Sequence, residues 1–78
     1  MLVDYVLGAL EHATYEKLDS GRYYGSIPEC PGVWGESETL EACRREVQEV
    51  LEDWLILKLR DGDDIPVIDG HDLNLQRA

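Results

Sequence analysis

The first apolar positions of the chain follow one face of a helix. Between Leu2 and Glu11, apolar residues recur at helical spacing, while Asp4 and Glu11 fall on the polar side. Gly8 weakens this segment, because glycine loses more backbone freedom on folding than other residues do. The pattern predicts a short N-terminal helix within residues 1–12.

Two stretches of strand character follow this helix, at Ala13–Leu18 and Arg22–Ile27. Asp19–Gly21 links them, and a short link that ends in glycine favours a hairpin, since glycine adopts the left-handed conformation without steric cost. Successive side chains of a strand point to opposite faces of a sheet. Tyr23 and Tyr24 are therefore expected on different faces.

A proline-rich turn and a third strand come next. Pro28–Gly32 has the composition of a turn. Pro31 followed by Gly32 suits a type II turn, in which proline presets φ and glycine takes the positive φ. Val33–Glu36 then has the character of a third short strand.

The longest apolar stripe predicts a second helix from Leu40 to about Arg60. Its apolar residues alternate at spacings of three and four, which places them on one continuous face. They are Leu40, Cys43, Val47, Val50, Trp54 and Leu57. Thr39 is suited to cap the first turn with its hydroxyl, and Gly62 is suited to end the helix.

The C-terminal end of this helix is apolar on nearly every side, and a helix of that kind is covered on more than one side. Either the first helix or a second subunit supplies the cover. We expect a subunit interface of a dimer or tetramer here. The residues assigned to it are Trp54, Leu55, Ile56 and Leu59.

A fourth apolar run, Ile65–Ile68, contains Pro66, which cannot donate to a strand ladder, so the run is expected as an edge strand. Asp69–Ala78 is polar and is expected as a loose tail, in which Leu73 and Leu75 are available to dock. The predicted fold is α+β, with a three-stranded antiparallel meander, this edge strand, one long helix packed on the sheet and a short N-terminal helix. One domain spans residues 1–78, with the helix at 1–12, a core at 13–68 and the tail at 69–78.

The net charge of the chain limits the classes of molecule that it is expected to bind. Among 78 residues, 17 are acidic and 7 are basic, which gives a net charge of −10. Such a chain repels phosphate backbones, so direct nucleic-acid binding is not expected. A basic protein would be attracted to it. Charge alone leaves open the alternative that it only keeps a small domain soluble.

No segment of the sequence predicts export or a membrane. The first residues lack the basic start of a signal peptide, and no apolar run approaches the ~20 residues of a membrane span. Cys30 and Cys43 form no CxxC motif, so reduced thiols and a cytoplasmic location are expected.

Motifs for catalysis and for metal binding are missing from the sequence. There is no phosphate-binding glycine loop and no GxSxG motif. Asp69, His71 and Asp72 are interpreted as part of a solvated tail rather than as metal ligands. Cys43 is expected in the core, and the acidic turn around Cys30 should raise its pKa. We therefore predict no enzyme activity, no cofactor and no metal.

Aromatic residues allow two interpretations. Tyr23 or Tyr24, together with Trp34, is expected to pack against the long helix. Trp and Tyr are also enriched among the residues that dominate protein interfaces.

The segment from Tyr24 to Ala42 resembles the signature of the HicB-like antitoxin family. A strand ending in Ile27–Pro28, a Pro31–Val33 turn and a Thr39–Ala42 helix start follow each other at that family's spacing, and the resemblance covers residues 13–68. It implies a degenerate ribonuclease H-like fold without the catalytic carboxylates. It also implies a small basic, RNA-cleaving partner of the HicA type, whose active surface the antitoxin covers, and it implies self-association.

The predicted function is therefore a non-catalytic, antitoxin-like protein-binding module. Glu29, Trp34, Glu36 and Glu38 are the expected partner contacts. The alternative is a stand-alone structural or regulatory homo-oligomer with no toxin partner. A residual nuclease would need carboxylates clustered on the sheet and a divalent metal. Only about ten residues follow Ile68, so no C-terminal DNA-binding module is expected.

Overall fold

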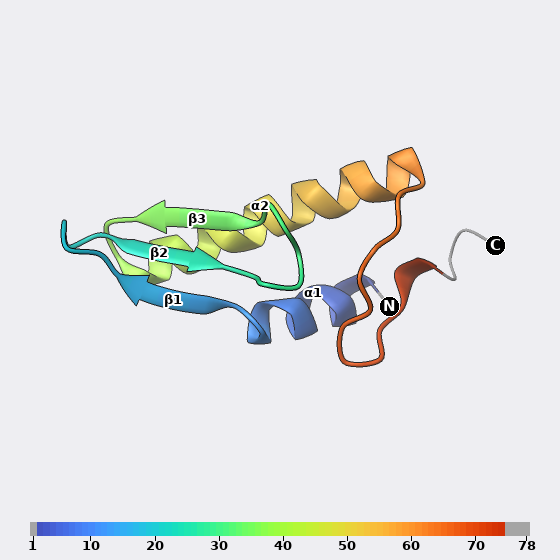
Figure 1. Cartoon of the computed structure of the whole chain (residues 1–78), viewed down its shortest axis with the longest axis horizontal. Helices are drawn as coiled ribbons and strands as arrows, with labels where there is room; N and C mark the ends of the chain where they lie inside the picture. Colours follow the sequence, from blue (N-terminus) through green and yellow to red (C-terminus); the bar gives the residue numbers. More distant parts are fainter. Residues whose placement is uncertain (1, 75–78) are drawn as a thin grey trace.

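Residues 2–74 fold into two helices and a small sheet. The computed structural model describes residues 2–74. Its elements are α1 (Leu2–Glu11), β1 (Thr14–Lys17), β2 (Tyr23–Ser26), β3 (Trp34–Ser37) and α2 (Leu40–Asp61). The sheet forms one layer, α2 lies behind it, and α1 lies beside α2 (Figure 1). The predicted α+β class, the order of these elements and the long helix are confirmed, and β3 lies one residue later than predicted.

The three strands form an antiparallel meander in the order β1-β2-β3. Two glycines make its turns possible. Gly21, with φ 89°, closes the link between β1 and β2, and Gly32, with φ 95°, lies in the turn before β3. In that second turn the Val33 N–H donates to the Cys30 carbonyl at 3.0 Å, as expected of a turn with proline and glycine at its centre.

Helix α2 begins and ends where local chemistry predicts. The Thr39 hydroxyl accepts a hydrogen bond from the Ala42 N–H at 3.1 Å, which satisfies one of the free donors of the first turn. Gly62 takes the left-handed conformation at the other end, with φ 72°. The inward side of α2 is a row of fully buried residues. They are Cys43, Val47, Leu51 and Leu55.

Small residues on one face of the sheet let α2 approach closely. A Cβ on Gly25 would lie 3.1 Å from Cγ2 of Val47, and a Cβ on Gly35 would lie 2.9 Å from Oε1 of Glu46. Both glycines are buried. The face of the sheet that carries them is therefore the face that packs against α2.

The predicted fourth strand does not form, although Ile65 and Ile68 are buried. The backbone N–H and C=O of Ile65 are both bound by the Asn74 side chain, at 2.9 and 2.7 Å. The Tyr5 hydroxyl donates to the Pro66 carbonyl at 2.6 Å. Pro66 has no N–H to donate, and side chains bind the backbone groups of Ile65 and Pro66, so the segment forms no strand hydrogen bonds with the sheet. It contains only an isolated bridge between Ile68 and His71.

Residues 69–74 are not the loose tail that was predicted. Leu73 is buried in the core, with 4% of its surface exposed, so the docking expected of it is confirmed. The turn at Asp69 and Gly70 brings the chain back past α1 (Figure 1). Leu75 lies outside the described residues. Neither α1 nor α2 is both long and apolar enough to span a membrane.

Candidate functional site

One face of the sheet is left open. Side chains alternate along a strand, so the residues beside Gly25 and Gly35 point away from α2. Tyr24 lies opposite Glu16 on β1 and opposite Glu36 on β3. Within residues 2–74, no helix or loop lies over this side of the sheet (Figure 1). We call this surface the open face; it comprises Glu16, Arg22, Tyr24, Trp34 and Glu36.

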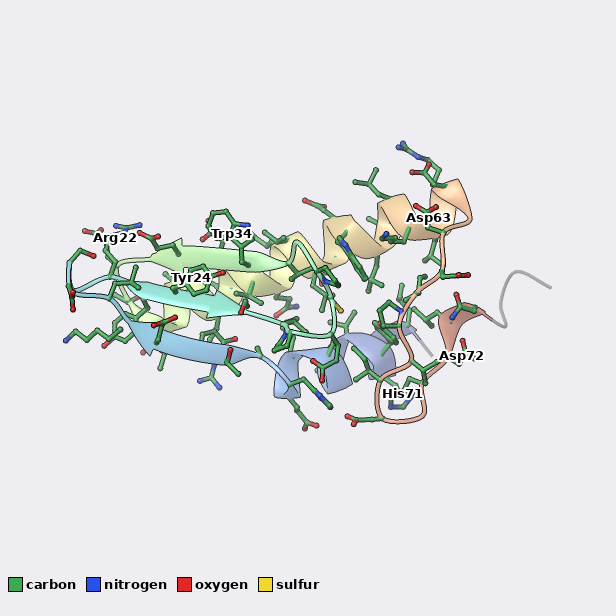
Figure 2. The ribbon with its side chains drawn as sticks, in the orientation of Figure 1. Arg22, Tyr24, Trp34, Asp63, His71 and Asp72 are labelled. Carbon is green, nitrogen blue, oxygen red and sulfur yellow. The ribbon has the colours of Figure 1, made fainter. Side chains whose placement is uncertain are left out.

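A stacked aromatic pair lies at the centre of the open face. The ring centroids of Tyr24 and Trp34 are 5.9 Å apart, with an angle of 25° between the planes (Figure 2). Trp34 is 52% exposed, which is unusual for so large an apolar side chain. The expectation that Trp34 packs against the long helix is therefore wrong. Of Tyr23 and Tyr24, it is Tyr23 that packs against the core, because it shares the face of Gly25.

Charged side chains border this pair. The Arg22 Nε lies 2.8 Å from the Glu36 carboxylate, and both side chains are well exposed, at 42% and 37%. The Glu36 N–H donates to the Glu46 carboxylate at 2.6 Å, which ties β3 to α2. Because both side chains are exposed, this ion pair contributes little free energy to folding.

Three of the four predicted contact residues lie on or next to the open face. Trp34 and Glu36 belong to it, and Glu38 is exposed in the short link between β3 and α2. Glu29 is different: it is exposed in the turn after β2, and its carboxylate binds the His12 ring at 2.7 Å. The structure therefore does not place Glu29 with the other three.

His12 joins three segments that are distant in sequence. Its Nδ1 lies 2.7 Å from Glu29 and its Nε2 lies 2.8 Å from Asp69, so each ring nitrogen is beside a carboxylate. The pKa of His12 is raised mainly by its hydrogen bond to Asp69 and next by its hydrogen bond to Glu29. In turn, the hydrogen bond to His12 lowers the pKa of Glu29. No sequence pattern indicated this cluster, because its members are 17 and 57 residues from His12.

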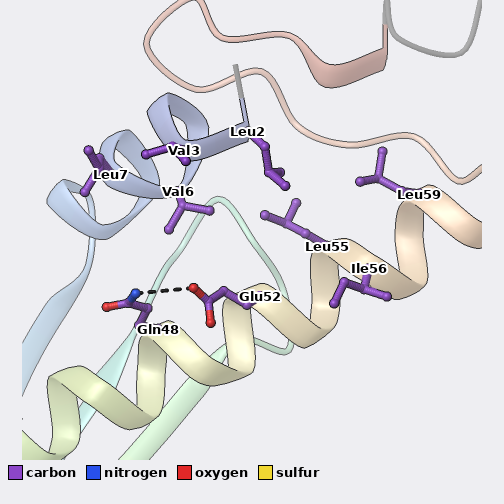
Figure 3. Close-up of a pocket in the computed structure, with 9 residues that line it drawn as sticks. All are labelled: Leu2, Val3, Val6, Leu7, Gln48, Glu52, Leu55, Ile56 and Leu59. Carbon is purple, nitrogen blue, oxygen red and sulfur yellow. Dashed lines mark hydrogen bonds between the residues drawn. The ribbon is translucent and has the colours of Figure 1, made fainter.

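An apolar groove of about 460 Å³ runs between α1 and α2 (Figure 3). Leu2, Val3, Val6 and Leu7 line it from α1, and Gln48, Glu52, Leu55, Ile56 and Leu59 line it from α2. Val3 is 70% exposed and Ile56 is 61% exposed. The groove is therefore an apolar surface open to solvent.

The predicted subunit-interface residues divide in two. Leu55, Ile56 and Leu59 line the groove, although Leu55 is only 2% exposed. Trp54 does not line the groove; its ring packs against the core and lies 5.4 Å from the Lys58 ammonium. The first helix thus covers one side of the α2 end and leaves the side of Ile56 uncovered.

Neither cysteine is placed for reaction. Cys30 and Cys43 are free and buried, and burial is the main cause that raises the pKa of each thiol. A raised pKa leaves less of the reactive thiolate at neutral pH. In the part of the chain from residue 2 to 74, no three His, Cys, Asp or Glu side chains are grouped so that they could hold a metal ion.

Comparison with known proteins places these features in a family context. A family model described as UPF0150-like matches residues 4–66. Among solved structures, the chain is similar to the protein TTHA0281 from Thermus thermophilus, with 38% sequence identity and a TM-score of 0.82. That match covers 86% of this chain and 84% of the other. A search of curated proteins found no match.

Proposed function

We propose that this chain, which belongs to the UPF0150-like family, is a non-catalytic protein-binding module of the antitoxin type. The proposed partner is a small basic protein that cleaves RNA, of the HicA type. In this proposal the open face covers the partner's active surface. The resemblance of Tyr24–Ala42 to the HicB-like signature supports the assignment.

The observation that carries the proposal is the exposed Tyr24–Trp34 stack on an acidic chain. Aromatic side chains bury a large area at low entropic cost, and Trp and Tyr are enriched where interfaces gain most of their energy. The net charge of −10 attracts a basic protein and speeds its encounter. The same charge opposes a bare RNA, although stacked aromatics on a sheet also suit base stacking.

The test is co-expression with the adjacent open reading frame, followed by size-exclusion chromatography with light scattering. We expect co-elution with a small basic protein, and we expect the complex to stop that protein from cleaving RNA. Trp34→Ala should weaken binding about 30-fold, the loss typical of a central aromatic contact. Leu57→Ala is the matched control, because Leu57 is also exposed but lies on α2, outside the open face.

Two results would count against the proposal. One is the absence of any complex at low salt, where attraction between opposite charges is strongest. The other is a complex that Trp34→Ala leaves unchanged. The first result would favour a stand-alone homo-oligomer, a second candidate that the exposed groove between α1 and α2 supports. The second result would mean that the partner binds a surface other than the open face.

A further inference from the structure

The groove between α1 and α2 holds four of the seven large, exposed apolar side chains of the described residues. The large apolar side chains exposed within residues 2–74 are Leu2, Val3, Leu7, Trp34, Ile56, Leu57 and Val67. Four of these seven line the groove, which makes it the main apolar surface of this part of the chain outside the core. An exposed apolar patch of this kind typically marks an interaction site.

The groove does not suit the basic partner proposed for the open face. Glu52 is the one ionisable side chain among the described residues that line it, and its carboxylate lies 3.3 Å from the Gln48 amide (Figure 3). A strongly basic protein would lose hydration here without gaining matching charges. The occupant of the groove must itself present an apolar surface.

The arrangement of charged residues along α2 indicates which molecule binds in the groove. Gln48, Glu52, Ile56 and Arg60 are spaced four residues apart, so they form one row along the same face of the helix. Ile56 lies midway between Glu52 and Arg60. The row therefore carries an acidic residue and a basic residue at equal distances on either side of an exposed apolar one.

We propose that a second copy of this chain docks on the groove, with the two α2 helices antiparallel and crossing at Ile56. A two-fold axis brings each residue opposite the one equally distant on the other side. Ile56 then meets Ile56 of the second copy, and each Glu52 faces Arg60 of the other copy. Arg60 is available to make this pair, because its contact with Asp61 is long, at 3.6 Å, and both side chains are mostly exposed.

This arrangement is independent of the proposed function. The open face lies on the side of the sheet away from α2, so a dimer formed through α2 leaves both open faces accessible (Figure 1). The resulting assembly would hold two copies of this chain with one partner on each. The Tyr24–Trp34 stack makes no contact with the dimer in this geometry.

Salt concentration should affect the dimer and the binding of the basic partner in opposite directions. Each copy carries a net charge of −10, so two copies repel at long range, and salt screens that repulsion. We expect the dimer to persist or tighten as sodium chloride rises from about 0.05 to about 0.5 M. Binding of a basic partner should weaken over the same range, because its long-range attraction is screened.

The experiment is sedimentation equilibrium and light scattering on the full chain. The wild type should be a dimer, and Ile56→Glu should raise the dimer dissociation constant at least tenfold. Leu57→Glu is the matched control, since it adds the same charge to a neighbouring exposed position of α2 outside the groove. Circular dichroism would verify that each variant keeps the helical content of the wild type.

A charge exchange tests the predicted pairing directly. Glu52→Arg and Arg60→Glu should each weaken the dimer, and the double variant should restore it. A monomeric wild type, a dimer unaffected by Ile56→Glu, or a double variant that stays monomeric would overturn the proposal. Loss of partner binding in Ile56→Glu with the dimer intact would show that the groove holds the basic partner instead. Trp34→Ala should leave the dimer unchanged, so failure of the proposed function is distinguishable from failure of this one.

Discussion

Replacement of Gly25 by alanine should destabilise the protein, although adding a methyl group to a glycine in a strand usually stabilises it. A Cβ at this position would lie 2.6 Å from Cδ1 and Cε1 of Tyr15 and 3.1 Å from Cγ2 of Val47. Favourable carbon–carbon contacts are about 3.5–4.0 Å. Val47 is fully buried on α2, so it cannot move without shifting the helix.

The magnitude follows from two opposing effects. The loss of chain entropy in the unfolded state, relative to glycine, favours alanine by about 0.4–1 kcal/mol. Overpacking costs about 1–3 kcal/mol. The net expected loss is about 1–2 kcal/mol, out of a total of about 4–12 kcal/mol for a domain of this length. For such a domain this loss lowers the melting temperature by about 4–16 °C.

Urea unfolding followed by far-ultraviolet circular dichroism measures this loss. Ser26→Ala is the control, because Ser26 is the next residue of β2 and points to the open face; its effect should be within about 0.5 kcal/mol. A Gly25→Ala protein as stable as the wild type would contradict the close packing of α2 on Gly25. It would mean that the Tyr15 ring and α2 yield without cost, so that α2 is not closely packed on the sheet.

Three further perturbations test other contacts. Thr39→Ala removes the N-cap hydrogen bond and should cost about 1 kcal/mol in urea unfolding, whereas Thr39→Ser should cost much less. Leu73→Ala should cost about 2–5 kcal/mol, because Leu73 is almost fully buried; a cost near zero would show that residues 69–74 do not dock. Asp69 and Glu29 raise the pKa of His12 above its ordinary value of 6.5. A raised pKa stabilises the folded state at low pH, and this contribution is lost as pH rises through the folded-state pKa. The stability advantage of wild type over His12→Gln should therefore shrink above neutral pH, and an NMR titration giving a His12 pKa at or below 6.5 would contradict the cluster.

Features that depend on neighbouring residues were predictable from the sequence. The Thr39 cap and the left-handed Gly62 fix α2 at both ends through contacts within one helical turn. Gly21 and Gly32 fix the two turns of the meander, because their positive φ values are costly for other residues. The periodicity of α2 predicted its buried side only in part. Cys43 and Val47 are buried as expected, but the buried side continues through Leu51 and Leu55, and Leu57 of the predicted stripe is 48% exposed.

The position of the candidate site was only partly predictable. Strand alternation placed Tyr23 and Tyr24 on opposite faces of β2, but it does not say which face receives α2. The glycines at positions 25 and 35 decide this, because they leave room for the helix on their own side. Trp34 is consequently part of an exposed surface rather than of the core.

The helices, the turns and the meander follow from local sequence, because caps, periodicity and glycine conformations act over a few residues. The conformation of residues 65–74 depends instead on tertiary contacts. There the Asn74 side chain binds the backbone of Ile65, and His12 binds Asp69, across separations that no local pattern records. The same is true of the groove beside Ile56, because residues of both α1 and α2 line it. Hydrogen bonds between distant segments can override the conformation that the local sequence favours. Which of these hydrogen bonds form depends on which groups folding brings within hydrogen-bond distance.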